Sequence, residues 1–322
     1  MRPFRRTTTV AALAALAITS VGATACSSST STSPHQLTVA YVVDPSWSHV
    51  PVAQNAGYFT SHGLDVRVVN FSTGVEALQA LTAGQVDVAT AAAVPTSAAL
   101  TRSPELRVVA DGSRWNGFRL VARKSAGITS LTDLNGKTIG TPLGTSGAFF
   151  ASTVLQHSGA DAKLVQVAPP AIVTAATQGN VDAVSIFQPY QTQVIQALGN
   201  DAAVLAPSGG DFVDHCLYLS TESVTNSKAA DLSAFFDALG EAGKDLAAQK
   251  PDALAAVSEA TKLDAALVSS VLREYDFTLQ LKPQLADELT ALGNWAKSNG
   301  KLDAGVTLPD YQQFFVGKFI GA

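Results

Sequence analysis

Hydroxyl-bearing residues gather in two short stretches, 72–74 and 142–147, where an expected strand gives way to an expected helix. The residues in them that could bind a ligand are Ser72, Thr73, Gly74, Thr145 and Ser146. Hydroxyls and the free backbone N–H groups at a helix start donate hydrogen bonds, and the helix dipole adds about half a positive charge there. The two stretches therefore indicate a site for a small oxyanion or polar head group.

Three further loops of the same kind are expected at 44–49, 92–97 and 188–190. Loops that follow the strands of an open α/β sheet share one edge of the sheet, where such folds bind ligands. Asp44 is the only carboxylate in the five loops, and Trp47 offers an aromatic wall for an organic tail or ring. Serine and threonine are also ordinary helix N-caps, so the prediction of a site rests on five loops at one edge.

The glycine-rich stretch at 140–147 does not match the known nucleotide-binding loops. No lysine follows Gly147, so the G-x-x-x-x-G-K-[ST] motif is absent. The spacing of Gly140, Gly144 and Gly147 also differs from G-x-G-x-x-G. Because the G-x-S-x-G nucleophile motif is missing as well, the chain lacks these signatures of nucleotide-binding and hydrolytic enzymes.

Residues that commonly carry catalysis or bind metals are few and scattered. The five histidines are His35, His49, His62, His157 and His215, and they form no cluster in the sequence. Cys216 adjoins His215, but neighbours in a strand point to opposite faces, so we predict a small buried cysteine rather than a nucleophile. We therefore predict that the protein is not an enzyme and has no catalytic residue, metal or cofactor.

Composition and charge limit the class of protein further. The chain has 322 residues, of which 47% are apolar, enough for a large core in two lobes. The formal net charge is −5, which argues against a nucleic-acid partner because such proteins present a basic face.

The N-terminal segment is typical of an exported protein. A basic start, an apolar stretch at 10–25 and small residues before Cys26 make a secretory signal, and the stretch is too short to span a membrane. Ala-Thr-Ala-Cys at its end resembles a bacterial lipoprotein signal. We predict a signal peptide at 1–25, lipidation of Cys26 and a serine-rich tether at 26–36 that anchors the protein to the outer face of the cell membrane. A plain cleaved signal is the alternative.

Strands and short helices alternate along the middle of the chain, which predicts parallel pairing in an α/β fold. Strands are expected at 36–43, 64–71, 86–93, 106–112, 137–141, 162–168 and 181–187. The stretches 81–89 and 175–184 repeat one pattern, a helix end, a glycine, a spacer and Val-Asp, so we expect two lobes built alike. Residues 228–322 are expected to be mainly helical scaffold.

Three stretches resemble one family of proteins. The stretch 56–93, AGYFTSHGLDVRVVNFSTGVEALQALTAGQVDVATAAA, is similar to the start of the nitrate/sulfonate/taurine branch of ABC-importer substrate-binding proteins. The stretch 131–146, LTDLNGKTIGTPLGTS, resembles that family's entry into its second lobe, and VDAVSIFQPY at 181–190 resembles a later segment. The sequence departs from the pattern at Phe187, where the family commonly has Trp.

The resemblance implies a two-lobe periplasmic-binding-protein type II fold, with a ligand cleft between the lobes and a helical C-terminal extension. The first lobe would take 37–122 and 220–322, and the second 123–219. The chain would cross between them near 121–124 and 217–221. Matching positions would place at the ligand Ser46, Trp47, Ser72, Thr73, Gly74, Val94, Thr96, Thr145, Ser146, Phe187 and Gln188.

The family resemblance also implies a function. The protein would be the extracytoplasmic receptor of an ABC importer, a monomer that closes on a small organic anion such as an aliphatic sulfonate or taurine. It would then dock on a membrane permease with its ATPase. Trp47 and Phe187 leave a pyrimidine thiamine precursor or another heteroaromatic open as the ligand. Two different roles also stay open, an enzyme on the same fold and a lipid-anchored sensor without a transporter.

Overall fold

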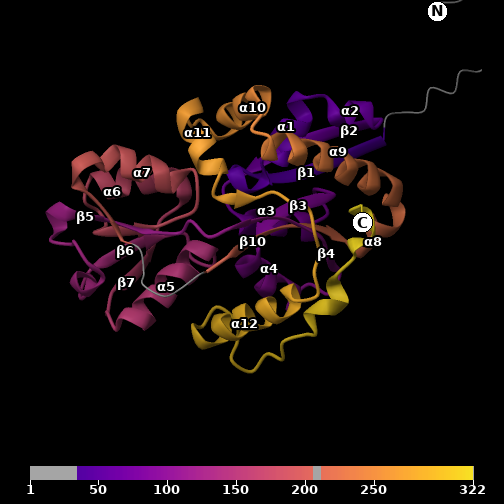
Figure 1. Cartoon of the computed structure of the whole chain (residues 1–322). Helices are drawn as coiled ribbons and strands as arrows, with labels where there is room; N and C mark the ends of the chain where they lie inside the picture. The colour runs from indigo at the N-terminus through magenta and orange to yellow at the C-terminus, as the bar shows by residue number, and fades with distance from the viewer. Residues whose placement is uncertain (1–34, 206–211, 322) are drawn as a thin grey trace, which may run out of the picture. The chain divides into compact units, whose positions relative to one another are not determined.

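The computed structural model describes residues 35–205 and 212–321 (Figure 1). The predicted signal peptide, Cys26 and most of the predicted tether therefore lie outside the described residues. All helices and strands belong to one compact unit, Pro34–Ala322. No helix in the described part of the chain is both long and apolar enough to cross a membrane.

The first sheet has six strands in the order β11-β4-β10-β3-β1-β2. Their bounds are β1 His35–Val42, β2 Leu64–Phe71, β3 Val88–Ala92, β4 Leu106–Trp115, β10 Asp214–Thr221 and β11 Tyr275–Asp276. β1 pairs in parallel with β2 and β3, as predicted, whereas β10 is antiparallel to both β3 and β4. The sheet is mixed because β10 enters it between β3 and β4 from the opposite end.

The second sheet has five strands in the order β7-β6-β8-β5-β9. Their bounds are β5 Leu120–Arg123, β6 Thr138–Thr141, β7 Lys163–Gln166, β8 Ala183–Ser185 and β9 Ala202–Leu205. β6 is parallel to β7 and β8, while β5 runs antiparallel to β8 and β9. The two sheets share the predicted strand–helix alternation, and each adds antiparallel strands where the chain enters or leaves it.

Helices cover both sheets (Figure 1). The α-helices are α1 His49–Asn55, α2 Tyr58–Ser61, α3 Gly74–Thr82, α4 Ala93–Leu100, α5 Ser146–Ser158, α6 Ile172–Thr177, α7 Tyr190–Leu198, α8 Glu222–Ser227, α9 Ala229–Ala247, α10 Pro251–Thr261, α11 Ala265–Leu272 and α12 Leu285–Ser298. The short 3₁₀ helices are η1 Pro45–Trp47, η2 Lys124–Ala126, η3 Leu131–Leu134, η4 Pro169–Ala171, η5 Gly199–Asp201, η6 Tyr311–Phe314 and η7 Gly317–Phe319.

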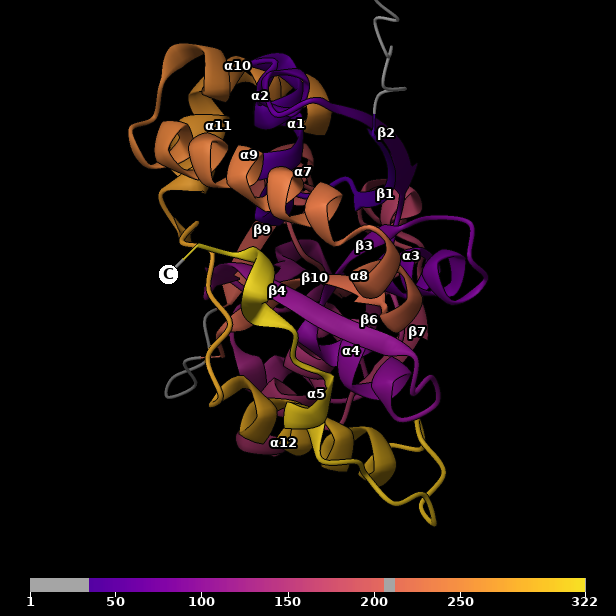
Figure 2. The same ribbon diagram turned by 90° about the vertical axis from the view of Figure 1, so that its right-hand side faces the viewer.

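The C-terminal part packs on the first sheet. Apolar residues at i, i+3 and i+4 spacing, such as Leu232, Phe235 and Leu239, face the core from α9. α9 contacts α1 and α2, whereas α12 contacts α4 and lies on the other side in Figure 1. Figure 2 shows the last residues, η6 and η7, passing over β4, which they contact. The predicted helical scaffold is confirmed for α9–α12, but the helices in 299–321 are only the short 3₁₀ helices η6 and η7.

The chain passes from the first sheet to the second at 116–119, between β4 and β5, and returns at 206–213, between β9 and β10. The crossings were expected near 121–124 and 217–221, a few residues further along the chain, where most residues belong to β5 and β10. The predicted lobe bounds, 37–122 with 220–322 and 123–219, stay a prediction. An aromatic cluster packs beside the first crossing, with Trp115 and Phe118 ring centroids 4.4 Å apart.

Candidate ligand-binding site

A narrow cavity lies where the carboxyl ends of β1 and β3 and the start of β10 meet the start of α5 and the turn after β8. The volume of the cavity is about 20 Å³, which is enough for roughly one water molecule. Its lining residues are Val42, Asp44, Ser46, Trp47, Gly74, Ala92, Pro95, Thr145, Ser146, Phe187, Asp214 and Cys216. We call this feature the strand-end cavity.

The strand-end cavity brings together predicted site residues from both sheets. Those in its lining are Ser46, Trp47, Gly74, Thr145, Ser146 and Phe187. The predicted residues outside the lining are Ser72, Thr73, Val94, Thr96 and Gln188. Residues as far apart in the chain as Ser46 and Phe187 therefore lie at one cavity, although the first follows a strand of the first sheet and the second a strand of the second, so two sheet edges contribute rather than the single edge that was expected.

The stretch 72–74 caps its own helix. The backbone N–H of Glu76 donates to Thr73 Oγ1 at 3.3 Å, and Glu76 Oε2 accepts from the N–H groups of Ser72 and Thr73 at 3.1 and 3.2 Å. This capping box satisfies the start of α3 with residues of the same helix. Only Gly74 lines the cavity, where a Cβ atom would lie 2.9 Å from Ala91 Cα, so a side chain would not fit without a shift.

The other predicted residues outside the cavity lining lie within helices or bond to them. Val94 and Thr96 are buried within α4. Gln188 Oε1 accepts a hydrogen bond from the Thr192 N–H at 3.2 Å, which fixes its side chain against the first turn of α7. None of these side chains faces the strand-end cavity.

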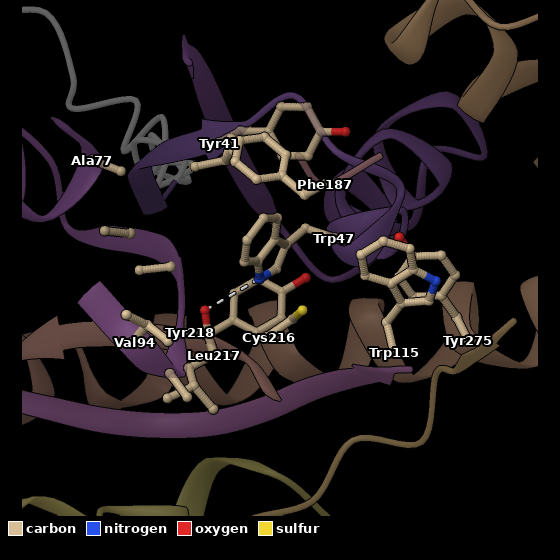
Figure 3. Packing of buried hydrophobic residues seen from close by; sticks show 14 of the residues in the cluster. Tyr41, Trp47, Ala77, Val94, Trp115, Phe187, Cys216, Leu217, Tyr218 and Tyr275 are labelled. Atoms are coloured by element: carbon tan, nitrogen blue, oxygen red, sulfur yellow. Dashed lines mark hydrogen bonds between the residues drawn. The ribbon is translucent and has the colours of Figure 1, made fainter. Parts of the chain in front are cut away.

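Trp47 lies in η1 and is only 3% exposed. Its indole N–H donates to the Leu217 carbonyl at 3.2 Å, which fixes the ring against β10 (Figure 3). The ring still lines the cavity together with Phe187 and Cys216. Trp47 therefore serves as a core anchor and as an aromatic wall of the cavity.

The hydroxyl groups of the cavity donate their protons to protein atoms. Ser46 Oγ donates to Asp44 Oδ1 at 2.5 Å, and Ser146 Oγ donates to Asp214 Oδ1 at 2.8 Å. Thr145 Oγ1 donates to the Pro142 carbonyl at 2.7 Å. The hydroxyls thus present lone pairs to the cavity rather than the donors that the sequence suggested. The donors that remain are backbone N–H groups in the first turn of α5.

Two buried carboxylates in the lining were missing from the predicted site. Asp44 and Asp214 are 3% and 4% exposed. Burial raises the pKa of each carboxyl to about 7, against the opposing effect of the bonds from Ser46 and Ser146, and the Asp44 charge raises the pKa of Asp214 further. Asp44 was noted in its loop as the only carboxylate. For Asp214 the available signal was strand alternation, which puts it on the same face as Cys216.

Cys216 is a buried free cysteine, as predicted. Burial raises the pKa of its thiol, and its Sγ donates a weak hydrogen bond to the Asp214 carbonyl at 3.8 Å. His215 faces the other way from β10, where its two ring nitrogens pair with Asp111 and Glu288, each at 2.8 Å. No histidine lines the cavity among the described residues, so nothing there activates the thiol.

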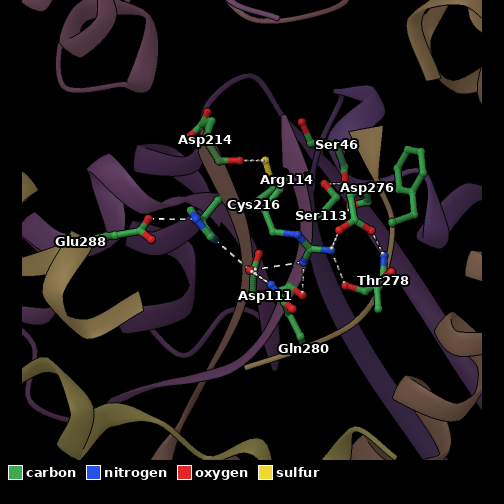
Figure 4. A network of polar contacts seen from close by, with 12 residues as sticks. Ser46, Asp111, Ser113, Arg114, Asp214, Cys216, Asp276, Thr278, Gln280 and Glu288 are labelled. Atoms are coloured by element: carbon green, nitrogen blue, oxygen red, sulfur yellow. Dashed lines mark hydrogen bonds and ion pairs between the residues drawn. The ribbon is translucent and has the colours of Figure 1, made fainter. Parts of the chain in front are cut away.

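Arg114 is buried near the end of β4. Its guanidinium pairs with Asp111 at 3.3 Å and with Asp276 at 2.8 Å (Figure 4). It also donates to the carbonyls of Asp276 and Thr278 at 3.2 and 2.8 Å. Arg114 therefore ties β4 to 276–278, outside the cavity lining. The Trp115 ring next to it stacks on Tyr275 with centroids 5.6 Å apart.

Two wider hollows lie away from the strand ends, one of about 530 Å³ beside α1 and α10 and one of about 670 Å³ along α9 and β11. Each is lined by residues of the first sheet and its helices alone, whereas the strand-end cavity draws on both sheets. In the described part of the chain, no group of three or more His, Cys, Asp or Glu side chains could hold a metal ion.

Solved structures with this arrangement are solute-binding proteins and an enzyme. The alkanesulfonate-binding protein SsuA of Xanthomonas axonopodis pv. citri superposes with a TM-score of 0.76 at 20% identity, covering 88% of this chain and 99% of that one. The nitrate-binding protein NrtA of Synechocystis superposes with a TM-score of 0.69 at 12% identity, covering 87% and 85%. The desulfurization enzyme DszB shares the fold with a TM-score of 0.65 at 13% identity, covering 88% and 97%. The predicted periplasmic-binding-protein fold is thereby confirmed.

Sequence comparison places the chain within one family. The NMT1/THI5-like family model matches residues 44–254, and the chain belongs to that family. The taurine-binding periplasmic protein of Escherichia coli is 27% identical over 176 residues, 53% of each chain. A binding protein of Brucella abortus is 32% identical over 156 residues, 47% of each chain. The chain thus spans about half the length of the curated relatives it matches. The predicted resemblance to the nitrate/sulfonate/taurine type is confirmed.

Proposed function

We propose that this chain is the extracytoplasmic substrate-binding protein of an ABC importer and captures a small organic sulfonate, aliphatic or taurine-like, in the strand-end cavity. The observation that carries the proposal is the lining itself, in which Trp47 and Gly74 from the first sheet meet Ser146 and Phe187 from the second. A site shared by two sheets can open and close as they move. The alkanesulfonate- and taurine-binding relatives support this solute class.

The proposed cycle begins with opening of the cavity, because its described volume of about 20 Å³ does not admit an organic solute. Bending at 116–119, where the chain passes from β4 to β5, would help to separate the two halves of the lining. Closure on the solute would then present the protein to a membrane permease and its ATPase. Lipid on Cys26 would keep the monomer at the outer face of the membrane.

An aromatic ligand is the second candidate, and a specific feature favours it. Trp47 and Phe187 both line the cavity (Figure 3), and two aromatic walls suit a flat ring such as a pyrimidine thiamine precursor. An enzyme on this fold would use Cys216, the only thiol in the lining. The raised pKa of that thiol and the lack of a neighbouring base among the described residues argue against it.

The test is a thermal-shift screen of the purified protein against sulfonates, nitrate, pyrimidines and amino acids. A solute at 100 times its Kd stabilises a protein by about 2.7 kcal/mol, so a sulfonate should raise the melting temperature clearly. A shift with a pyrimidine and with no anion would overturn the sulfonate assignment. Chemical conversion of any panel member would overturn the receptor role itself.

A further inference from the structure

The charge of the strand-end cavity does not match a simple anion. Its lining contains the carboxyl groups of Asp44 and Asp214 and no lysine, arginine or histidine among the described residues. The two carboxyls come from different segments, the turn after β1 and the start of β10, and they are close enough for the Asp44 charge to act on Asp214. A plain sulfonate would enter a site whose ionisable side chains are all acids or a thiol.

Each carboxyl keeps one oxygen without a protein partner. Oδ1 of Asp44 accepts from the N–H and Oγ of Ser46, and Oδ1 of Asp214 accepts from Ser146 Oγ. Oδ2 of either residue has no hydrogen bond with the described residues, although the side chains are 3% and 4% exposed. Two unpartnered acceptors, each on a residue more than nine-tenths buried, therefore line the same small cavity.

The cationic side chains near the cavity already form ion pairs with other residues. Arg114 pairs with Asp111 and Asp276, and His215 pairs with Asp111 and Glu288 (Figure 4). Neither lines the strand-end cavity. Ionised carboxylates buried without a partner are costly, and the cost falls only when a cation or several donors reach them. A donor on the solute that reaches the Oδ2 atoms would offset this cost when the two carboxyls are ionised.

We infer that the solute bears a cationic nitrogen group, an ammonium or an amidinium, that donates to Oδ2 of Asp44 and Oδ2 of Asp214. This inference rests on the proposed solute-binding function and narrows it to amino-bearing ligands. An anionic or polar end of the same solute would lie at the start of α5, where the N-cap Thr145 makes no side-chain cap bond and the first N–H groups have no intrahelical partner. Trp47 and Phe187 would flank the body between the two ends.

The ionisable groups around the two carboxyls are acids, phenols, a thiol and one histidine that is already paired with other carboxylates. Those that interact with Asp44 or Asp214 are Tyr41, Tyr190, Tyr275, Cys216, Asp111 and His215. A cationic ligand needs both carboxyls ionised, so its affinity should rise as the pH passes through about 7, where they titrate. A purely anionic ligand needs them neutral, and its affinity should fall over the same interval.

Matched solutes test the inference by calorimetry on the full chain. Taurine and isethionate differ only by an amino or a hydroxyl group, and benzamidine and benzamide form the equivalent aromatic pair, whose amidinium member stays cationic across this pH range. The amino member of one pair should bind roughly 10- to 100-fold more tightly than its partner, because a hydrogen-bonded charge pair is lost in the other. The pair that responds also tells whether the body is a sulfonate or a ring.

Substitutions at the two carboxyls test whether these residues bind the amino group. Asp44→Asn and Asp214→Asn should each weaken the amino probe roughly 10- to 100-fold and thereby narrow the difference in affinity between the amino probe and its hydroxyl or oxo partner. Asp252→Asn, at an exposed position on α10, is the matched control and should change neither. Circular dichroism would verify that each variant is folded. Because two independent variants carry the test, failure of one to fold leaves the other decisive.

Three outcomes would overturn the inference. They are equal affinity within a pair, binding by none of the four probes, and affinity of an amino probe that falls from pH 6 to pH 8. The receptor role survives each of them if the broader thermal-shift screen finds another solute that is bound and returned unchanged. That role fails separately, when a solute is chemically converted.

Discussion

At the scale of single residues, ionisation of Asp44 and Asp214 would favour a cationic solute but lower the stability of the ligand-free protein. Burial raises the pKa of both carboxyls to about 7, so the folded protein holds protons that the unfolded chain releases near pH 4. The ligand-free protein should therefore be most stable with the carboxyls neutral and should lose stability as they ionise. Sites that sacrifice stability in this way are commonly those that bind something.

Asp214→Asn should flatten this pH dependence. In the parent protein the contribution of a raised pKa is fully present below the unfolded value of 3.8 and is lost as the pH rises through about 7. Between pH 5 and pH 8 the ligand-free parent should lose roughly 2 kcal/mol more unfolding free energy than the variant. Urea unfolding at both pH values measures the difference, and equal slopes for the two proteins would show that Asp214 ionises normally.

Thr145→Ala combined with Ser146→Ala should weaken solute binding without unfolding the protein. The change removes two hydroxyls from the lining, including the bond from Ser146 to Asp214, so roughly a tenfold loss of affinity is expected. Ser152→Ala on the same helix is the control, because Ser152 Oγ bonds only to the Ala148 carbonyl within α5. Loss of folding in the double variant would mean that these residues mainly support the helix.

At the scale of elements, a buried ion network holds β4, β10 and α12 together behind the cavity. Asp111 on β4 meets Arg114 from its own strand and His215 from β10, and His215 reaches Glu288 on α12. Burial would lower the pKa of His215, but the bonds to Asp111 and Glu288 outweigh it and raise that pKa to about 9. The imidazolium therefore persists at neutral pH and fixes the start of β10, next to Asp214.

Asp111→Asn should destabilise the protein by about 3 kcal/mol, because it leaves Arg114 and His215 without their shared buried partner. Chemical denaturation at pH 7 measures the change. Asp252→Asn, exposed on α10, should shift the unfolding free energy by less than about 0.5 kcal/mol. Equal stability of the two variants would show that the network contributes little.

The elements were more predictable than the directions of their side chains. Alternating strands and glycine-terminated helices placed β1, β2, β3 and β6 close to their observed bounds, because periodicity and caps are local signals. The hydroxyl of Ser146 was expected to face a ligand as a donor. It bonds instead to Asp214, 68 positions away, and no local pattern reports such a partner. The crossing points depend on distant partners in the same way, since strand pairing sets where β5 and β10 begin.

At the scale of the whole molecule, the small volume of the strand-end cavity implies that the two sheets must move apart for a solute to enter. A volume of about 20 Å³ admits roughly one water molecule, so a solute can enter only when the two halves of the lining separate. The fold shared with solute-binding proteins is consistent with such a movement. Cys216 lines the cavity and can report it, because its thiol is buried while the cavity is closed.

Labelling of Cys216 should therefore slow when a solute binds. In the full chain with Cys26→Ser, a maleimide should react through transient opening of the cavity, and a saturating solute should reduce the rate at least about tenfold by favouring the closed form. Mass spectrometry measures the rate, and Cys216→Ser should give no labelling. An unchanged rate under saturation would mean that the solute binds elsewhere.

The most direct test of the central claim is a crystal structure of the protein with a solute found in the thermal-shift screen. We expect one solute molecule in the strand-end cavity between Trp47 and Phe187. Its nitrogen group should lie within hydrogen-bond distance of Asp44 and Asp214, and its other end should lie at the start of α5. A solute bound only in one of the wider hollows beside α9 or α10, with the strand-end cavity unchanged, would contradict it.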